Sequence, residues 1–186
     1  MAIQLINKQK FKETFRVVGN PKLRILGLMH QPPEEIRYSN NMPIRMLEVA
    51  HDAFDVQGKQ IVHTGKSKAV YLVGSFVSLR NDKTYRCYEA THLNQSWTRQ
   101  VQEIHPVTKM SKGTFQYVEL GPINVAVLHS SYPMKLDENP TQVASVISTH
   151  QLQTGDIVGD FLIREVRVEY GLYFANAHYK TVTPNG

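Results

Sequence analysis

The chain has very little of what usually reveals a function. Cys87 is its single cysteine, so no intrachain disulfide can form, and a reducing compartment is expected. No apolar run approaches the ~20 residues that are needed to cross a bilayer. The first residues lack the apolar core of a secretion signal, and we expect none. Hydrophobic residues at 41% and charged residues at 20% nevertheless indicate a folded protein rather than a disordered one.

Recognisable motifs of catalysis and metal binding are missing as well. The segment 65–67 (GKS) resembles the end of a phosphate-binding loop, but Gln60 stands where that loop needs a glycine. No two of the eight histidines have the spacing that places two imidazoles on one face of a strand or helix. Cys87 lies within a predicted strand, which favours a buried thiol over a nucleophile. Asp156 and Asp160 are interpreted as solvated turn residues. The sequence therefore predicts no catalytic residue, no metal ligand and no cofactor.

Positive charge is concentrated at the start of the chain. The net charge is +5, and up to Arg24 there are six basic side chains against one acid, Glu13. A loop rich in proline and asparagine follows at 31–43. We therefore predict a basic N-terminal arm at 1–30 and a single β-rich domain at 31–186. A basic arm on a neutral body is typical of docking, onto nucleic acid or onto an acidic protein.

Most of the body has the composition of strands. Apolar, β-branched and aromatic residues predict hairpins of 69–79 with 84–91 and of 161–169 with 172–177. They also predict a hairpin or a bend at 121–122, between the strands 114–120 and 123–129. The last hairpin is expected to contain a bulge at 164–165, where two charged residues interrupt the alternation.

Helical patterns are few. Apolar spacing and flanking proline and glycine predict two short helices, over 44–54 and over 139–150, the second following a loop at 132–140. Residues 8–18 also favour a helix over a strand. The predicted class is α+β and β-dominated: an open barrel or sandwich of about six or more strands, with two short helices and the N-terminal arm.

The segment GDIVGDFLIREVRVEYGLYFANA (155–177), the proline-punctuated arm and the short hairpins resemble a group of viral proteins. These are the small β-rich virion structural proteins of tailed bacteriophages, of the neck, tail, baseplate or decoration type. The resemblance implies a non-enzymatic subunit that assembles with copies of itself and with other proteins of the same particle. It also implies assembly into a virion in the host cytoplasm, without a membrane partner.

The leading hypothesis is therefore a structural assembly subunit that docks to its neighbours through the arm. We assign partner binding to the basic and apolar side chains of that arm, which are Lys8, Lys10, Phe11, Lys12, Phe15, Arg16, Lys22, Arg24, Leu26, Leu28 and Met29. One alternative is a nucleic-acid-binding module that makes a weak contact through the same arm. Another is an unrecognised enzyme with a pocket lined by His63, His92 and His129.

Overall fold

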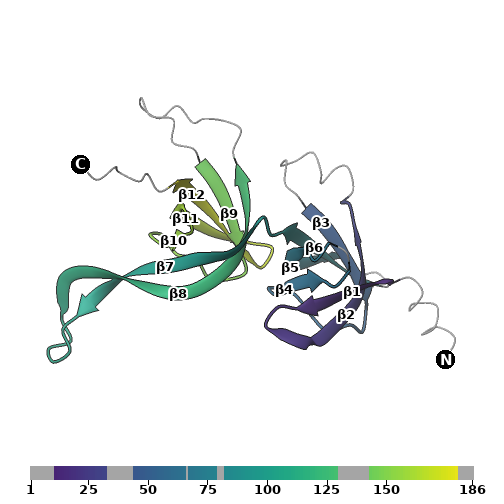
Figure 1. The fold of residues 1–186 in the computed structure, drawn as a ribbon, viewed down its shortest axis with the longest axis horizontal. Coiled ribbons are helices and arrows are strands. Elements are labelled where there is room, and N and C mark those ends of the chain that lie inside the picture. The colour runs from purple at the N-terminus through teal and green to yellow at the C-terminus, as the bar shows by residue number, and fades with distance from the viewer. Residues whose placement is uncertain (1–10, 33–43, 66, 79–81, 130–142, 180–186) are drawn as a thin grey trace.

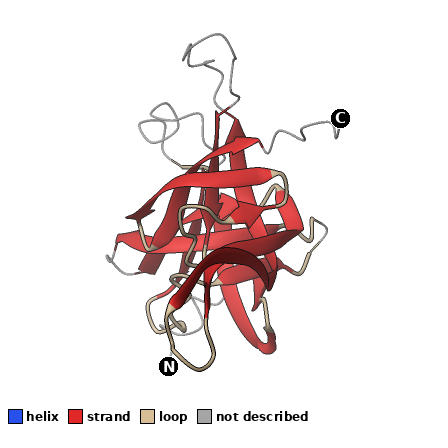
Figure 2. Ribbon diagram, turned by 90° about the vertical axis from the view of Figure 1, so that its left-hand side faces the viewer, coloured by secondary structure: helices blue, strands red, loops and turns tan. Residues whose placement is uncertain are grey.

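The structure is a computed structural model that describes residues 11–32, 44–65, 67–78, 82–129 and 143–179. Every regular element within these ranges is a strand (Figure 2). The twelve strands form two antiparallel six-stranded sheets, each closed into a barrel. In Figure 1 the two barrels lie side by side, with the first at the right and the second at the left.

The first barrel contains the N-terminal half of the described chain. Its strands follow the order β1-β2-β3-β6-β5-β4, and β4 pairs with β1 to close the ring. The strands are β1 (Glu13–Val17), β2 (Asn20–His30), β3 (Ile44–Ala50), β4 (Gln60–His63), β5 (Val70–Ser78) and β6 (Asp82–Glu89). Side chains that alternate along them, including Phe15, Leu47 and Tyr85, fill the interior.

The second barrel contains the C-terminal half. Its strands follow the order β10-β11-β12-β9-β8-β7, and β7 pairs with β10 to close it. The strands are β7 (His92–Ile104), β8 (Ser111–His129), β9 (Val143–Ser148), β10 (Ile157–Val158), β11 (Phe161–Glu169) and β12 (Leu172–Tyr179). Val125, Val146 and Ile163 are among the fully buried side chains of its core.

A third apolar cluster joins the barrels. It combines outward-facing residues of β3, β5 and β6 with outward-facing residues of β8, β9 and β12. At its centre the rings of Tyr88 and Phe174 meet edge to face, with centroids 5.5 Å apart. Close by, Ser75 N donates a hydrogen bond to the carbonyl of Tyr170. A Cβ at Gly74 would lie 2.9 Å from that same carbonyl oxygen, so only glycine permits this approach of β5 to the β11–β12 turn.

The structure contradicts the predicted class, because strands and turns take the place of both expected helices wherever these are described. The segment expected to begin a helix at 44 forms β3, and residues 143–148 of the second form β9; residues 139–142 lie outside the described ranges. Both strands are buried on two faces, one in a barrel core and one in the cluster between the barrels. The resulting apolar run has no period of two, and its spacing resembled that of a helix.

The N-terminal segment also differs from what the sequence predicted. Residues 13–17 form β1 rather than a helix, and β1 and β2 are neighbouring strands of the first barrel. Phe15 is fully buried there, so the boundary predicted at residue 30 falls inside the first barrel. Closure of the ring needs this pair of strands, because β1 lies between β2 and β4.

The hairpin predictions have mixed outcomes. The pairs 69–79 with 84–91 and 161–169 with 172–177 are confirmed as β5–β6 and β11–β12. The bulge is confirmed too, because the register shifts between Ile163 and Glu165. Of the two alternatives for 114–120 and 123–129, the hairpin is wrong: both segments belong to the single strand β8, which passes through Gly121 at a φ of 113°.

Candidate assembly surface

The outer halves of β7 and β8 form a two-stranded ribbon that extends from the second barrel. In the described chain, β10 pairs with β7 at Trp97 and Thr98, and β9 pairs with β8 from Ala126 onward. Beyond those limits, β7 and β8 pair only with each other over residues 99–120. Figure 1 shows this part extending away from both barrels. We call residues 99–120 the ribbon.

Exposed apolar side chains cover the ribbon. Phe115 and Tyr117 are 58% and 59% exposed, and Val107 at the turn is 81% exposed. The other exposed apolar members are Ile104, Met110, Val118 and Leu120. A two-stranded hairpin with no third strand or helix behind it is marginally stable in water. A large exposed apolar patch usually marks an interaction site. The ribbon therefore has the character of a surface that another molecule covers.

The turn of the ribbon is ordered by backbone and side-chain hydrogen bonds. His105 N donates to the carbonyl of Met110 at 2.8 Å, and Lys109 N donates to the carbonyl of His105 at 2.9 Å. The Nδ1 atom of His105 accepts from the backbone N–H groups of Val107 and Thr108 at 3.3 and 3.2 Å. Lys109 has the positive φ of 57° that a tight reversal requires. The apolar residues are thus held at a defined tip.

A buried carboxylate fixes the base of the ribbon. Asp156, which is 1% exposed, accepts two hydrogen bonds from Arg99, at 2.8 Å on Oδ1 and 2.9 Å on Oδ2. Its Oδ2 atom also accepts from Trp97 Nε1 and from the backbone of Gln153, both at 2.9 Å. Arg99 and Trp97 belong to β7, while Asp156 precedes β10. The interpretation of Asp156 as a solvated turn residue is therefore wrong.

The same contacts set the ionisation of this group. Burial alone raises the pKa of Asp156, but the hydrogen bonds from Arg99, Trp97 and Gln153 outweigh it and hold the pKa below its ordinary value. The partnership with Asp156 raises the pKa of Arg99 in turn. Both groups are charged when the ribbon is in place, and a bidentate pair of this kind has a strong directional preference. The ribbon base is consequently fixed in orientation relative to the barrel.

Of the residues that the sequence assigned to partner binding, some are buried and others face outward. Phe11 and Phe15 are buried, and Lys8 and Lys10 lie outside the described residues. Leu28 and Met29 are half-buried, and Lys12 is exposed. The remaining members line the outer face of the β1–β2 hairpin, and these are Arg16, Lys22, Arg24 and Leu26. Phe11 and Phe15 thus serve the core, while Leu26 and the basic groups face outward.

Two of those basic groups lie directly opposite each other. Arg16 on β1 is the cross-strand partner of Arg24 on β2. The Nε atom of Arg16 is buried, and no other described group accepts a hydrogen bond from it. Like charges opposite each other in a sheet are destabilising. This outer face would therefore be stabilised by an anionic partner.

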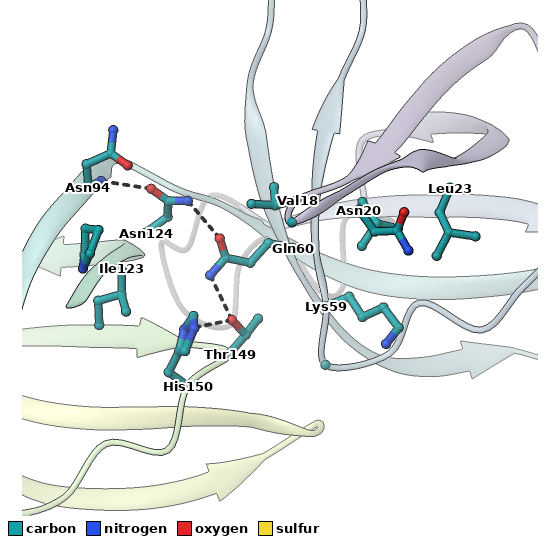
Figure 3. Close-up of a pocket in the computed structure, with 14 residues that line it drawn as sticks. Val18, Asn20, Leu23, Lys59, Gln60, Asn94, Ile123, Asn124, Thr149 and His150 are labelled. Carbon is teal, nitrogen blue, oxygen red and sulfur yellow. Dashed lines mark hydrogen bonds between the residues drawn. The ribbon is translucent and has the colours of Figure 1, made fainter. Parts of the chain in front are cut away.

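A polar cleft of about 630 Å³ lies between the barrels. Figure 3 shows a chain of hydrogen bonds along it. Asn94 N donates to Asn124 Oδ1, Asn124 Nδ2 donates to Gln60 Oε1, and Gln60 Nε2 donates to Thr149 Oγ1, at 2.8–2.9 Å. Burial lowers the pKa of His150 at the end of this chain. Because Gln60 belongs to the first barrel and its partners to the second, the chain ties the barrels together.

The three histidines of the enzyme hypothesis belong to strands of both barrels. His63 belongs to β4 of the first barrel and packs edge to face on Phe15. His92 starts β7 and packs on Phe161 of the second barrel core, and His129 ends β8. Among the described residues, no three His, Cys, Asp or Glu side chains could hold a metal ion together. Cys87 is buried in the first barrel, as predicted, and burial raises the pKa of its thiol.

One arrangement near His63 has the order of a hydrolase triad. Ser67 Oγ lies 3.1 Å from His63 Nδ1, and His63 Nε2 lies 3.9 Å from Glu13 Oε2. The second distance exceeds that of a hydrogen bond. The carboxylate oxygen instead accepts a hydrogen bond from Met29 N at 2.9 Å. Glu13 therefore does not orient the imidazole as the third member of a triad must.

Comparison of the chain with protein-family models, with curated proteins and with solved structures finds no match. None of the described residues forms a helix long and apolar enough to span a membrane. We therefore argue function from the geometry of this molecule. Reasoning from the sequence missed the ribbon, because β7 is too polar to be recognised as a strand. The one signal that could have revealed it was the segment TFQYVEL (114–120), which is apolar on both faces of a strand.

Proposed function

We propose that this chain is a non-enzymatic assembly subunit of a larger particle, and that the ribbon contacts a neighbouring subunit. The observation that carries the proposal is the ribbon itself: a projection with exposed apolar side chains on a base that is fixed by Asp156. A protein that acted alone would gain nothing from such a surface, because exposed apolar area promotes association. The resemblance to virion proteins of tailed bacteriophages supports a virion, assembled in the host cytoplasm, as that particle.

The main contact with a neighbour is therefore expected on the ribbon rather than on the N-terminal segment. Phe11 and Phe15, which were expected to anchor a neighbour, are buried in the first barrel. The outer face of β1 and β2 still offers Arg16, Lys22 and Arg24 to a second, acidic neighbour. A subunit with two different contact surfaces can form rings or lattices, which a single self-complementary surface cannot.

A ribbon-shortened chain tests the proposal. Residues 102–115 are replaced by Asn-Gly, a two-residue turn that joins the paired Val101 and Gln116. We expect the full chain to form concentration-dependent assemblies in mass photometry and electron micrographs, and the shortened chain to remain monomeric with an unchanged melting temperature. A matched control, Val168→Ser, removes a similarly exposed apolar side chain from β11. Equal assembly of the shortened and full chains would contradict the proposal.

A second candidate function is nucleic-acid binding through the outer face of β1 and β2. The opposed Arg16 and Arg24 favour it, because phosphate groups would relieve their repulsion. Binding should then weaken steeply with salt, and Arg16→Gln with Arg24→Gln should reduce the slope by about one for each phosphate that is no longer neutralised. Filter binding of single- and double-stranded DNA at low salt measures this. No retention of either would exclude the candidate.

A further inference from the structure

The outer edge of β8 pairs with no other strand of the described chain over the ribbon. The strand pairs with β7 on one side, and on the other side, within the described chain, β9 reaches it only from Ala126 onward. From Phe115 to Glu119 the pairing with β7 runs without a register shift, so the strand is regular here. Natural edge strands are usually protected by lysine, proline, bulges or short length. The register places extra residues on β8 at Leu120 and within 112–114, but the regular stretch 115–119 between them contains no lysine or proline and only one charge, Glu119.

The edge of β7 on the opposite side of the ribbon is less suited to pairing. Its portion within the ribbon contains two charged residues, Arg99 and Glu103. Arg99 is also held against Asp156 at the base. Charge and a fixed side chain both disfavour a third strand on that side.

We propose that the outer edge of β8 pairs with the same edge of a second copy of this chain, in an antiparallel arrangement centred on Gln116. The inference rests on the proposed function, because it names the molecule that covers the ribbon. Two identical edges can join about a two-fold axis perpendicular to the sheet, and two-fold symmetry is the commonest among protein oligomers. The two ribbons then form one four-stranded sheet, in which opposed residues share a face.

The side chains select this register. With Gln116 at the axis, Phe115 of each copy lies opposite Tyr117 of the other, so four aromatic rings gather on one face. Glu119 then lies near Gly113, where β8 leaves the regular register, and it does not face Glu119 of the other copy. If the axis lies at Phe115, the two Phe115 rings face each other and Tyr117 faces Gly113. If it lies at Tyr117, the two Tyr117 rings face each other and Phe115 faces Glu119. Either register therefore keeps only one aromatic pair. Aromatic cross-strand pairs stabilise a sheet, so the register centred on Gln116 is preferred.

The buried area is sufficient for a weak dimer. A fully buried aromatic side chain contributes about 150–250 Å², and Phe115 and Tyr117 are both more than half exposed in the single chain. Edge pairing leaves both faces of the joined sheet open to water, so the rings are covered only where they meet across the two copies, and the area stays below the roughly 1,000 Å² of a stable, specific interface. We therefore expect dissociation constants on the order of micromolar, which many copies in one particle would reinforce.

A charge swap at the axis tests the register. Gln116 is exposed and would face its counterpart in the second copy, so Gln116→Lys and Gln116→Glu each place two like charges directly opposite each other. Each variant alone should weaken self-association by about tenfold or more, and an equimolar mixture should restore it. The matched control is Gln100→Lys, on the exposed β7 side of the same ribbon. Sedimentation velocity over a range of concentrations measures all four samples.

A disulfide provides the second readout. Gln116→Cys should form a covalent dimer under mild oxidation, because residues directly opposite across two antiparallel strands lie within disulfide distance. Cys87 is buried and does not compete, and Gln100→Cys is the control. Assembly of the wild-type chain that is unaffected by either Gln116 charge would overturn the inference and leave the proposed function standing. A wild-type chain that stays monomeric would overturn both.

Discussion

The two strands β7 and β8 have an inner and an outer half that differ in almost every physical respect. In the inner half, Val125 and Val127 are buried and Asp156 fixes Arg99 at the base. In the outer half, Phe115 and Tyr117 are exposed, and no third strand of the described chain supports the pair. The inner half packs as a strand of the barrel, whereas the outer half exposes apolar side chains of the kind that are buried at the centre of an interface.

Under the proposed function, one pair of strands serves two purposes. The inner half obtains its stability from the barrel, so its residues need to be apolar and regular. The outer half obtains nothing from the barrel, and its apolar side chains are useful only when another molecule covers them. Changes in the inner half should therefore act on folding, and changes in the outer half should act on association.

The largest effect is expected at the base of the ribbon. Asp156→Ala removes the acceptor of Arg99 and Trp97 and leaves them unpaired, which should lower the free energy of unfolding by about 3 kcal/mol. This value is the lower end of the usual range for a broken buried pair, because Arg99 is 21% exposed and water can reach it. Urea denaturation followed by the fluorescence of Trp97, the single tryptophan, measures it. Asp160→Ala, at an exposed site in the same loop, should change stability by less than about 0.5 kcal/mol.

A loss of similar size is expected between the barrels. Phe174→Ala removes a buried ring from the cluster that joins them and should cost about 3 kcal/mol. Trp97 reports on the second barrel alone, while circular dichroism reports on both. In the wild-type chain the two unfolding curves should coincide, and in the variant they should separate. Coincident curves in the variant would mean that the barrels do not depend on this cluster for cooperative unfolding.

The pH dependence of folding should carry the signature of Asp156. Its pKa is lowered in the folded state, so the unfolded chain binds more protons in acid. The stability from this group is present above the ordinary value of 3.8 and is lost as the pH falls below it, through the folded pKa. The acid loss measured by denaturation should therefore be smaller in Asp156→Asn than in wild type. Identical slopes below pH ~4 would show that Asp156 is not ionised in the fold.

The smallest effect on folding is expected in the outer half. Phe115→Ser with Tyr117→Ser changes only exposed side chains, so stability should stay within about 0.5 kcal/mol of wild type. Self-association should nevertheless disappear, because the aromatic face is removed. Thermal melting and sedimentation velocity on the same sample separate the two outcomes. A large drop in melting temperature would show that the ribbon contributes to folding of the single chain.

The sequence predicted hairpins where turn residues and alternation were unambiguous. Tyr170-Gly171 and the charged pair at 164–165 located β11, β12 and the bulge between them. The prediction failed for β3 and β9, because strands that are buried on both faces lose the period of two that distinguishes them from helices. Closure of either barrel could not be predicted, because it depends on pairs such as β1–β4 that are distant in the chain.

The candidate site was predicted only in part. Arg16, Lys22 and Arg24 do face outward, as a docking role requires, but Phe11 and Phe15 are core residues. Net charge along the chain could not reveal which side of a strand each residue occupies. The ribbon was missed because residues 98–104 are mostly polar and are not buried, and such strands leave little hydrophobic pattern.

Hydrogen–deuterium exchange of the full-length chain at low and high protein concentration tests most directly whether the ribbon is a surface that a neighbouring subunit covers. Amides of residues 113–120 should exchange rapidly in dilute protein and become protected as the concentration rises, while amides of both barrels stay unchanged. Equal protection of the ribbon at every concentration would contradict the proposed role of β7 and β8 in assembly.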